Sequence, residues 1–195
     1  MQRSIVRKSF VLAPLLLAMF AAHANAQDFL KGNVYGGYSF LSAPGNPPFT
    51  SRATFNGWDG SVEFKLAPGI GAVADFGGNY GTVPIATSCP ASLGECGPVE
   101  VNTKLYTYVF GPRFSAPIGR FRPFAHVLFG GAHSSGSGDG FTSSNSSYAV
   151  ALGGGLDYKL IKGIAWRAQF DDMVTKAISN SQNNLRFTTG VVFRF

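Results

Sequence analysis

Charged side chains recur at every second position along many segments of this chain, and they are its main candidates for chemistry. Asp59 and Glu63 alternate with apolar residues, and so do Arg167 and Asp171 further along. Carboxylates and guanidiniums on one face of a strand can form buried ion pairs, or a narrow ion pathway gated by exchange of those pairs. We expect one inner charge network made of Asp59, Glu63, Asp75, Arg113, Asp157, Arg167, Asp171 and Arg186.

The same polar face carries four further cations, which add to the positive charge that its carboxylates must balance. The four are Lys65, Arg122, Lys159 and Arg194. Asp171 and Arg186 fall near the same end of neighbouring segments, so we expect them to pair. The favoured interpretation is a set of ion pairs that fills the interior and compensates buried charge.

A nucleophile with a general base is the second candidate. His133 and Ser135 share one face of a segment, and Ser134 lies between them. A serine beside a histidine can perform acyl transfer. However, the serines begin the run SSGSGDG, which is typical of a flexible loop, and no carboxylate is clearly placed to orient His133. We therefore expect no enzymatic activity.

Two cysteines, Cys89 and Cys96, lie in a Pro-, Ser- and Gly-rich segment. In an exported chain this arrangement predicts a local disulfide. No histidine lies near them, so a metal site is not expected. The segment GNVYGG at 32–37 precedes no helix and is therefore not a phosphate-binding loop. No metal and no cofactor are expected.

The N-terminal segment predicts export. Three cations within the first eight residues precede an apolar run over 10–22, and Ala24-Asn25-Ala26 forms a small-x-small cleavage site. The run is short for a membrane-spanning helix, which needs about 20 residues. We expect residues 1–26 to be a signal peptide cleaved after Ala26, and 27–195 to form one domain.

The remaining chain alternates apolar and polar residues, which predicts amphipathic strands. The polar face also carries small residues, such as Ala151 and Gly153, which suit a narrow interior. The opposite face carries Trp, Tyr, Phe, Leu and Val, which suit lipid. The pattern predicts an all-β fold, an eight-stranded antiparallel up-and-down transmembrane β-barrel. The expected strands are 31–41, 54–66, 69–80, 102–114, 121–133, 147–160, 163–173 and 184–195.

The connections alternate between short and long. Three short turns are expected, near Ala67–Gly69, Ala116–Arg120 and Ile161–Lys162. Four long loops, rich in Ser, Asn, Gly and Pro, are expected near 42–53, 81–101, 134–146 and 174–183. Membrane barrels join their strands by short periplasmic turns and longer extracellular loops, and this chain follows that order.

Three segments carry a resemblance to a known family: YVFGPRFS at 108–115, RPFAHVLFGG at 122–131, and the final strand ending in Phe193 and Phe195. With its eight amphipathic strands, the chain over 28–195 resembles the small OmpA-like, opacity-type outer-membrane β-barrels. The resemblance implies location in the bacterial outer membrane, among lipid and lipopolysaccharide. It also implies that Phe193 and Phe195 form the C-terminal signal for the barrel-assembly machinery.

The function expected from these features is a structural or surface-interaction role, with a plugged lumen and four extracellular loops that could bind an unidentified surface ligand. A small ion or solute channel is the alternative. A lipid A-modifying enzyme is the third reading, because some eight-stranded outer-membrane barrels use Ser and His for that purpose. Nucleic acid is not an expected partner, because the net charge of +6 includes the leader's cations and no basic run follows. We expect a monomer.

Overall fold

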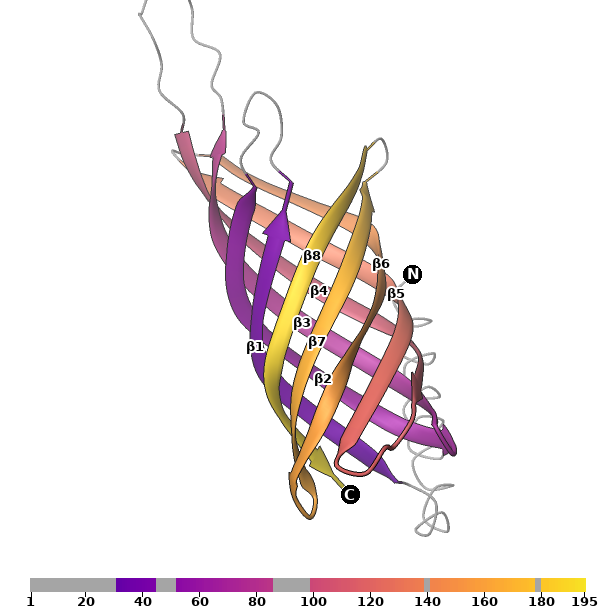
Figure 1. The fold of residues 1–195 in the computed structure, drawn as a ribbon. Coiled ribbons are helices and arrows are strands. Elements are labelled where there is room, and N and C mark those ends of the chain that lie inside the picture. Colours follow the sequence, from indigo (N-terminus) through magenta and orange to yellow (C-terminus); the bar gives the residue numbers. More distant parts are fainter. Residues whose placement is uncertain (1–30, 45–51, 86–98, 139–140, 178–179) are drawn as a thin grey trace, which may run out of the picture. The chain divides into compact units, whose positions relative to one another are not determined.

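Eight antiparallel strands close into one barrel in the computed structural model, which confirms the predicted fold (Figure 1). The structure describes residues 31–44, 52–85, 99–138, 141–177 and 180–195. The predicted signal peptide and the two cysteines lie outside these residues. The strands are β1 (Gly32–Ala43), β2 (Ala53–Ala67), β3 (Ile70–Ile85), β4 (Val99–Ser115), β5 (Phe121–Gly138), β6 (Phe141–Ile161), β7 (Ile164–Ala177) and β8 (Asn180–Arg194).

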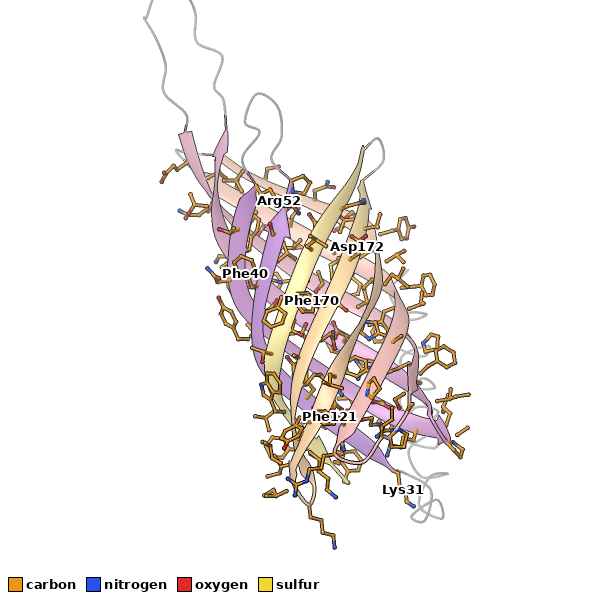
Figure 2. The ribbon with its side chains drawn as sticks, in the orientation of Figure 1. Lys31, Phe40, Arg52, Phe121, Phe170 and Asp172 are labelled. Atoms are coloured by element: carbon orange, nitrogen blue, oxygen red, sulfur yellow. The ribbon has the colours of Figure 1, made fainter. Side chains whose placement is uncertain are left out.

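Side chains alternate between the lumen and the outer face, as the pleat of a strand requires. Along β6, Ala149 and Ala151 are buried, whereas Tyr148 is 83 % exposed. Every strand places large apolar side chains on the outer face, among them Phe40, Phe121 and Phe170 (Figure 2). Among the described residues, no helix is long and apolar enough to cross a membrane.

The three predicted short turns lie together at one end of the barrel, which we call the turn end. Each contains a glycine with positive φ: 80° at Gly69, 62° at Gly119 and 83° at Gly163. This backbone conformation is unfavourable for residues with a Cβ. The pairing register shifts just before two of these turns, between Lys65 and Ala67 and between Lys159 and Ile161.

At the opposite, loop end, two of the four predicted long loops are wrong. Instead of a loop over 134–146, β5 and β6 continue until Gly138 pairs with Phe141. Instead of a loop over 174–183, β7 and β8 continue until Ala177 pairs with Asn180. These segments are rich in Ser, Asn and Gly, and Asn and Gly have low strand propensity alone, but pairing with a neighbouring strand overrides that preference.

Strands β3 to β6 extend beyond their neighbours at the loop end. Pairing of β2 with β3 stops at Asn56 and Tyr80, whereas pairing of β3 with β4 continues to Ile85 and Val99. Pairing of β6 with β7 likewise starts only at Tyr148. The four strands therefore form a sheet that continues past the closed barrel, and we call this part the β3–β6 extension.

The seam between β1 and β8 closes the barrel. Ten residue pairs from Asn33–Arg194 to Ser42–Leu185 join the two strands. At the turn end, the Gly32 and Phe195 backbones bond each other in both directions, each N to the other's O at 3.1 Å.

Candidate functional site in the barrel lumen

The structure places all eight residues of the inner charge network inside the barrel, each no more than 3 % exposed. Six of the eight strands contribute one or two of these residues. Each residue occupies a position whose side chain points into the lumen. Hydrogen bonds and ion pairs connect them into two groups, one around Arg186 and Arg113 and the other around Asp157.

Arg186 on β8 is shared by three carboxylates. Its Nη1 lies 2.6 Å from Asp59 Oδ2 and 3.0 Å from Asp75 Oδ1. Its Nη2 and Nε lie 2.7 and 3.0 Å from Asp171 Oδ2. Asp171 lies directly opposite Arg186 on the neighbouring β7, as expected from the sequence. Asp59 and Asp75 belong to β2 and β3, so these two contacts tie β8 to strands beyond β1.

Arg113 on β4 extends this group toward the turn end. Its Nη1 lies 3.2 Å from Glu63 Oε2, which also accepts from Asn33 Nδ2 at 2.8 Å. Its Nη2 donates to Gln169 Oε1 at 3.5 Å and lies 3.4 Å from Nδ1 of His126. The polar residues Asn33 and Gln169 are not in the predicted network, although their alternation places them on the inner face.

His126 connects Arg113 to the carboxylate group. A guanidinium only donates, so Nδ1 of His126 accepts from Arg113 and the ring proton sits on Nε2. Nε2 lies 2.8 Å from Oδ1 of Asp171 and donates to it. His126 is thus a hydrogen-bonded lumen residue with both ring nitrogens engaged.

Asp157 on β6 forms the second group. Arg167 binds it through two parallel hydrogen bonds, from Nε to Oδ1 at 2.7 Å and from Nη2 to Oδ2 at 3.1 Å. Nη2 of Arg194 adds a third bond to Oδ2 at 2.9 Å. This geometry is the bidentate arrangement that suits a guanidinium and a carboxylate.

One aromatic ring separates cations of the two groups. The guanidinium carbons of Arg113 and Arg167 lie 4.4 and 4.7 Å from the ring centroid of Phe124. The guanidinium carbon of Arg167 also lies 5.1 Å from the ring centroid of Tyr35. The π-face attracts a cation, so Phe124 holds two like charges in a small space without direct contact between them.

An apolar cluster fills another part of the lumen, and it was not predicted from the sequence. Its members come from β3 to β7, and Leu105 packs against them. They are Val73, Val109, Leu128, Ala132, Ala149, Ala151 and Met173. The alternation could have identified them, because they sit on the same inward positions as the charged residues of their strands.

The four further predicted lumen cations are less enclosed than the eight residues of the network. Lys159 pairs with the inward Ala165 at the turn end, just before the register shift, and is exposed there. Lys65 and Arg122 are half-buried, and Nε of Arg122 donates to Ser115 Oγ at 3.1 Å. Arg194 is the fourth, and it joins the Asp157 group.

The structure does not bring the predicted serine and histidine candidates together by any hydrogen bond. His133 is exposed on the outer face, with Nδ1 2.9 Å from the hydroxyl of Ser146. The hydroxyl of Ser134 donates instead to the backbone oxygen of Asn145 at 3.4 Å. Within the described ranges, no group of three or more His, Cys, Asp or Glu residues has the arrangement of a metal site.

The outer face carries aromatic contacts toward both ends and a carboxylate on β7. The rings of Phe121 and Tyr158 lie 5.2 Å apart at a tilted angle at the turn end, and those of Tyr80 and Tyr106 meet edge-on at 6.0 Å toward the loop end. Asp172 on β7 is exposed between them (Figure 2). It has no hydrogen-bond or ion-pair partner within the described part of the chain.

Comparisons with known proteins agree with this architecture. The family model described as "Outer membrane protein beta-barrel domain" matches residues 11–195. Neisserial surface protein A aligns over 84 % of this chain and 97 % of its own, with 12 % identity and a TM-score of 0.65. The attachment invasion locus protein Ail of Yersinia pestis aligns over 86 % and 99 %, with 15 % identity and a TM-score of 0.58. The outer membrane protein OprG from Pseudomonas aeruginosa aligns over 86 % and 96 %, with 12 % identity and a TM-score of 0.53. No curated protein sequence matches the chain.

Proposed function

The chain belongs to the family of outer-membrane β-barrel domains and is located in the bacterial outer membrane, and from this premise we propose that it has a structural or surface-interaction role with a plugged lumen. The resemblance to small outer-membrane barrels expected from the sequence is confirmed. The proposed role is that of the barrel after its insertion into the outer membrane.

The observation that carries the proposal is that Arg186 binds three carboxylates across the lumen. An eight-stranded barrel has an interior just wide enough for side chains. Arg186 joins β8 to Asp59 on β2 and Asp75 on β3, while Arg113 and Arg167 occupy the space nearer the turn end. Breaking such buried pairs is costly, so they favour a closed lumen over a permanently open pore.

The β3–β6 extension supports the surface-interaction part of the proposal. Residues 142–146 of β6 are all exposed and consist of Thr, Ser and Asn. Loops at this end would be extracellular, and binding residues are often found on loops and strand ends held by a rigid scaffold. The ligand is an unidentified surface molecule.

Other parts of the proposal concern the barrel's surroundings. Lipid and lipopolysaccharide would cover the outer apolar face, and Phe193 and Phe195 would present the C-terminal signal to the barrel-assembly machinery. The protein would act as a monomer without a cofactor or an enzymatic activity. Lipid A from cells with and without the protein should then have the same mass spectrum.

Conductance across a planar bilayer tests the closed lumen. The reconstituted protein should show little steady current, and vesicles that contain it should not admit sugars. An Asp172→Asn variant is a matched control, because it removes a charge of the outer face and leaves the lumen intact. A stable, large, voltage-independent single-channel conductance from the wild type would refute the plug and favour the small-channel alternative.

A further inference from the structure

The two groups of the inner charge network are unevenly balanced. Asp157 is bound by two arginines, whereas Asp59, Asp75 and Asp171 surround the single guanidinium of Arg186. Nε2 of His126 also lies 2.8 Å from Asp171, and its Nδ1 lies 3.4 Å from Nη2 of Arg113. The group around Arg186 therefore has an excess of negative charge.

Two carboxylate oxygens of this group have no hydrogen-bond partner among the residues that the structure describes. They are Oδ1 of Asp59 and Oδ2 of Asp75, on residues that are 2 % and 0 % exposed. The other oxygen of each carboxylate bonds the same nitrogen, Nη1 of Arg186. Both carboxylates thus flank one point in the lumen, and an unpaired anionic oxygen at such depth is costly.

A neutral oxygen lies at the same place. A Cβ added to Gly77 would be 2.8 Å from Oγ1 of Thr107 and 3.4 Å from both Asp59 Oδ2 and Arg186 Nη1. The hydroxyl of Thr107 is buried and has no hydrogen-bond partner among the described residues. The absence of a side chain at Gly77 therefore leaves open the space that this hydroxyl shares with Asp59 and Arg186.

We propose that Asp59 and Asp75, with the hydroxyl of Thr107, bind one additional unit of positive charge, as a proton or an alkali cation. Carboxylate and hydroxyl oxygens suit hard cations. Two carboxylates that share a site can also hold one proton between them. In either form the occupant reduces the charge excess and gives the open oxygens a partner. The inference is independent of the proposed surface role.

The response to pH depends on every group that faces the pair. Arginines stay protonated, so only the carboxylates, His126 and Tyr35 can titrate. The charged and titratable groups that face the pair are Arg186 on β8, Asp171 and Arg167 on β7, His126 on β5, Arg113 on β4 and Tyr35 on β1.

Reversible urea unfolding of the chain in detergent micelles tests the proposal, with ionic strength kept constant by N-methyl-D-glucamine chloride. If the occupant is a proton, the folded state binds one more proton than the unfolded state from about pH 5 up to the pKa at which the pair releases it. Across that window the folding constant falls about tenfold per pH unit. If it is an alkali cation, the folding constant at fixed pH rises up to about tenfold for each tenfold increase in NaCl.

Two variants and one control assign the effect to the pair. Asp59→Asn and Asp75→Asn each remove one charge at constant shape, so each should abolish the dependence on proton or sodium and should be no less stable than the wild type at high pH without sodium. Asp157→Asn, in the group where two arginines bind one carboxylate, should lower stability and keep the wild-type dependence. A wild type insensitive to both pH and sodium, or Asp59 and Asp75 variants that retain its dependence, would overturn the proposal.

Discussion

Asp171 and Asp172 are neighbours on β7, yet they experience opposite environments. Asp171 is 2 % exposed and accepts hydrogen bonds from His126, Gln169 and Arg186. Asp172 points outward, between Leu152 on β6 and Leu185 on β8, its register partners. One step along a strand exchanges the lumen for the lipid-facing side.

This difference shows where the barrel can accommodate a charged side chain. Inside, strands distant in sequence supply the counter-charge, so an anion on β7 meets a cation from β8 and a histidine from β5. Outside, the neighbours of Asp172 are apolar and a bilayer provides no hydrogen-bond donor. Nothing in the structure explains the presence of Asp172. Four sets of substitutions test this contrast, from the largest expected effect to the smallest.

Arg186→Leu breaks the inner side of the comparison. It leaves three buried carboxylates without their shared cation, so the free energy of unfolding should fall by about 3–5 kcal/mol. Arg167→Leu should cost less, because Arg194 remains bound to Asp157. Urea titrations of both variants in bilayers measure the difference. Equal losses, or a larger loss for Arg167→Leu, would contradict the central role of Arg186.

Val191→Arg adds a charge to the outer side. Val191 is 38 % exposed and faces outward, so an arginine there should lower the free energy of unfolding by about 2–4 kcal/mol if it lies near the bilayer midplane. Leu152→Arg should cost less, although Leu152 is 61 % exposed, because the new cation lies opposite Asp172. Ser144→Arg on the exposed part of β6 should have almost no effect in the same refolding assay. No loss at both Val191 and Leu152 would reject the assignment of the outer face.

Phe124→Leu sharpens the inner side, because it removes the ring between two cations. Loss of two desolvated cation–π contacts should lower the free energy of unfolding by about 2 kcal/mol. Phe129→Leu is the matched control on the outer face of the same strand, where leucine suits lipid as well as phenylalanine does. Equal effects in thermal unfolding would show that the ring acts by volume alone.

Asp172→Leu should have the smallest effect and the opposite sign. Removal of an outward charge without a partner in the described residues should raise the free energy of unfolding by about 1 kcal/mol, since the cost of a lipid-facing carboxylate depends on depth and is below that of Arg or Lys. A double-mutant cycle with Leu152→Arg should give a favourable coupling between the two side chains. A loss of stability in Asp172→Leu would indicate a contact that supports this carboxylate.

Local alternation made much of this molecule predictable. It identified eight strands and the inward side of each, so residues directly opposite one another, such as Asp171 and Arg186, could be paired in advance. The contacts of Arg186 with Asp59 and Asp75 could not be predicted, because they depend on how the closed barrel brings β8 toward β2 and β3. The apolar cluster around Leu128 was also missed, since the charges on the same face dominated the interpretation.

The errors at strand ends have a common cause. Beyond the membrane both faces of a strand meet water, so the serines of β5 and β6 show no alternation even though their backbones remain paired. At the turn end, Lys159 keeps the inward register opposite Ala165 but lies at the end of the strand, where it is exposed. Alternation predicts a strand only where its two sides meet different surroundings.

The seam between β1 and β8 imposes an order of events on folding. β1 pairs with β2 along one edge and with β8 along the other, and the β8 seam joins Gly32 to Phe195, near opposite ends of the barrel sequence. Closure of so long a loop is intrinsically slow. Until β8 arrives, the free edge of β1 can pair with another chain. The rate at which β1 pairs with another chain should therefore depend on how long its edge remains unpaired.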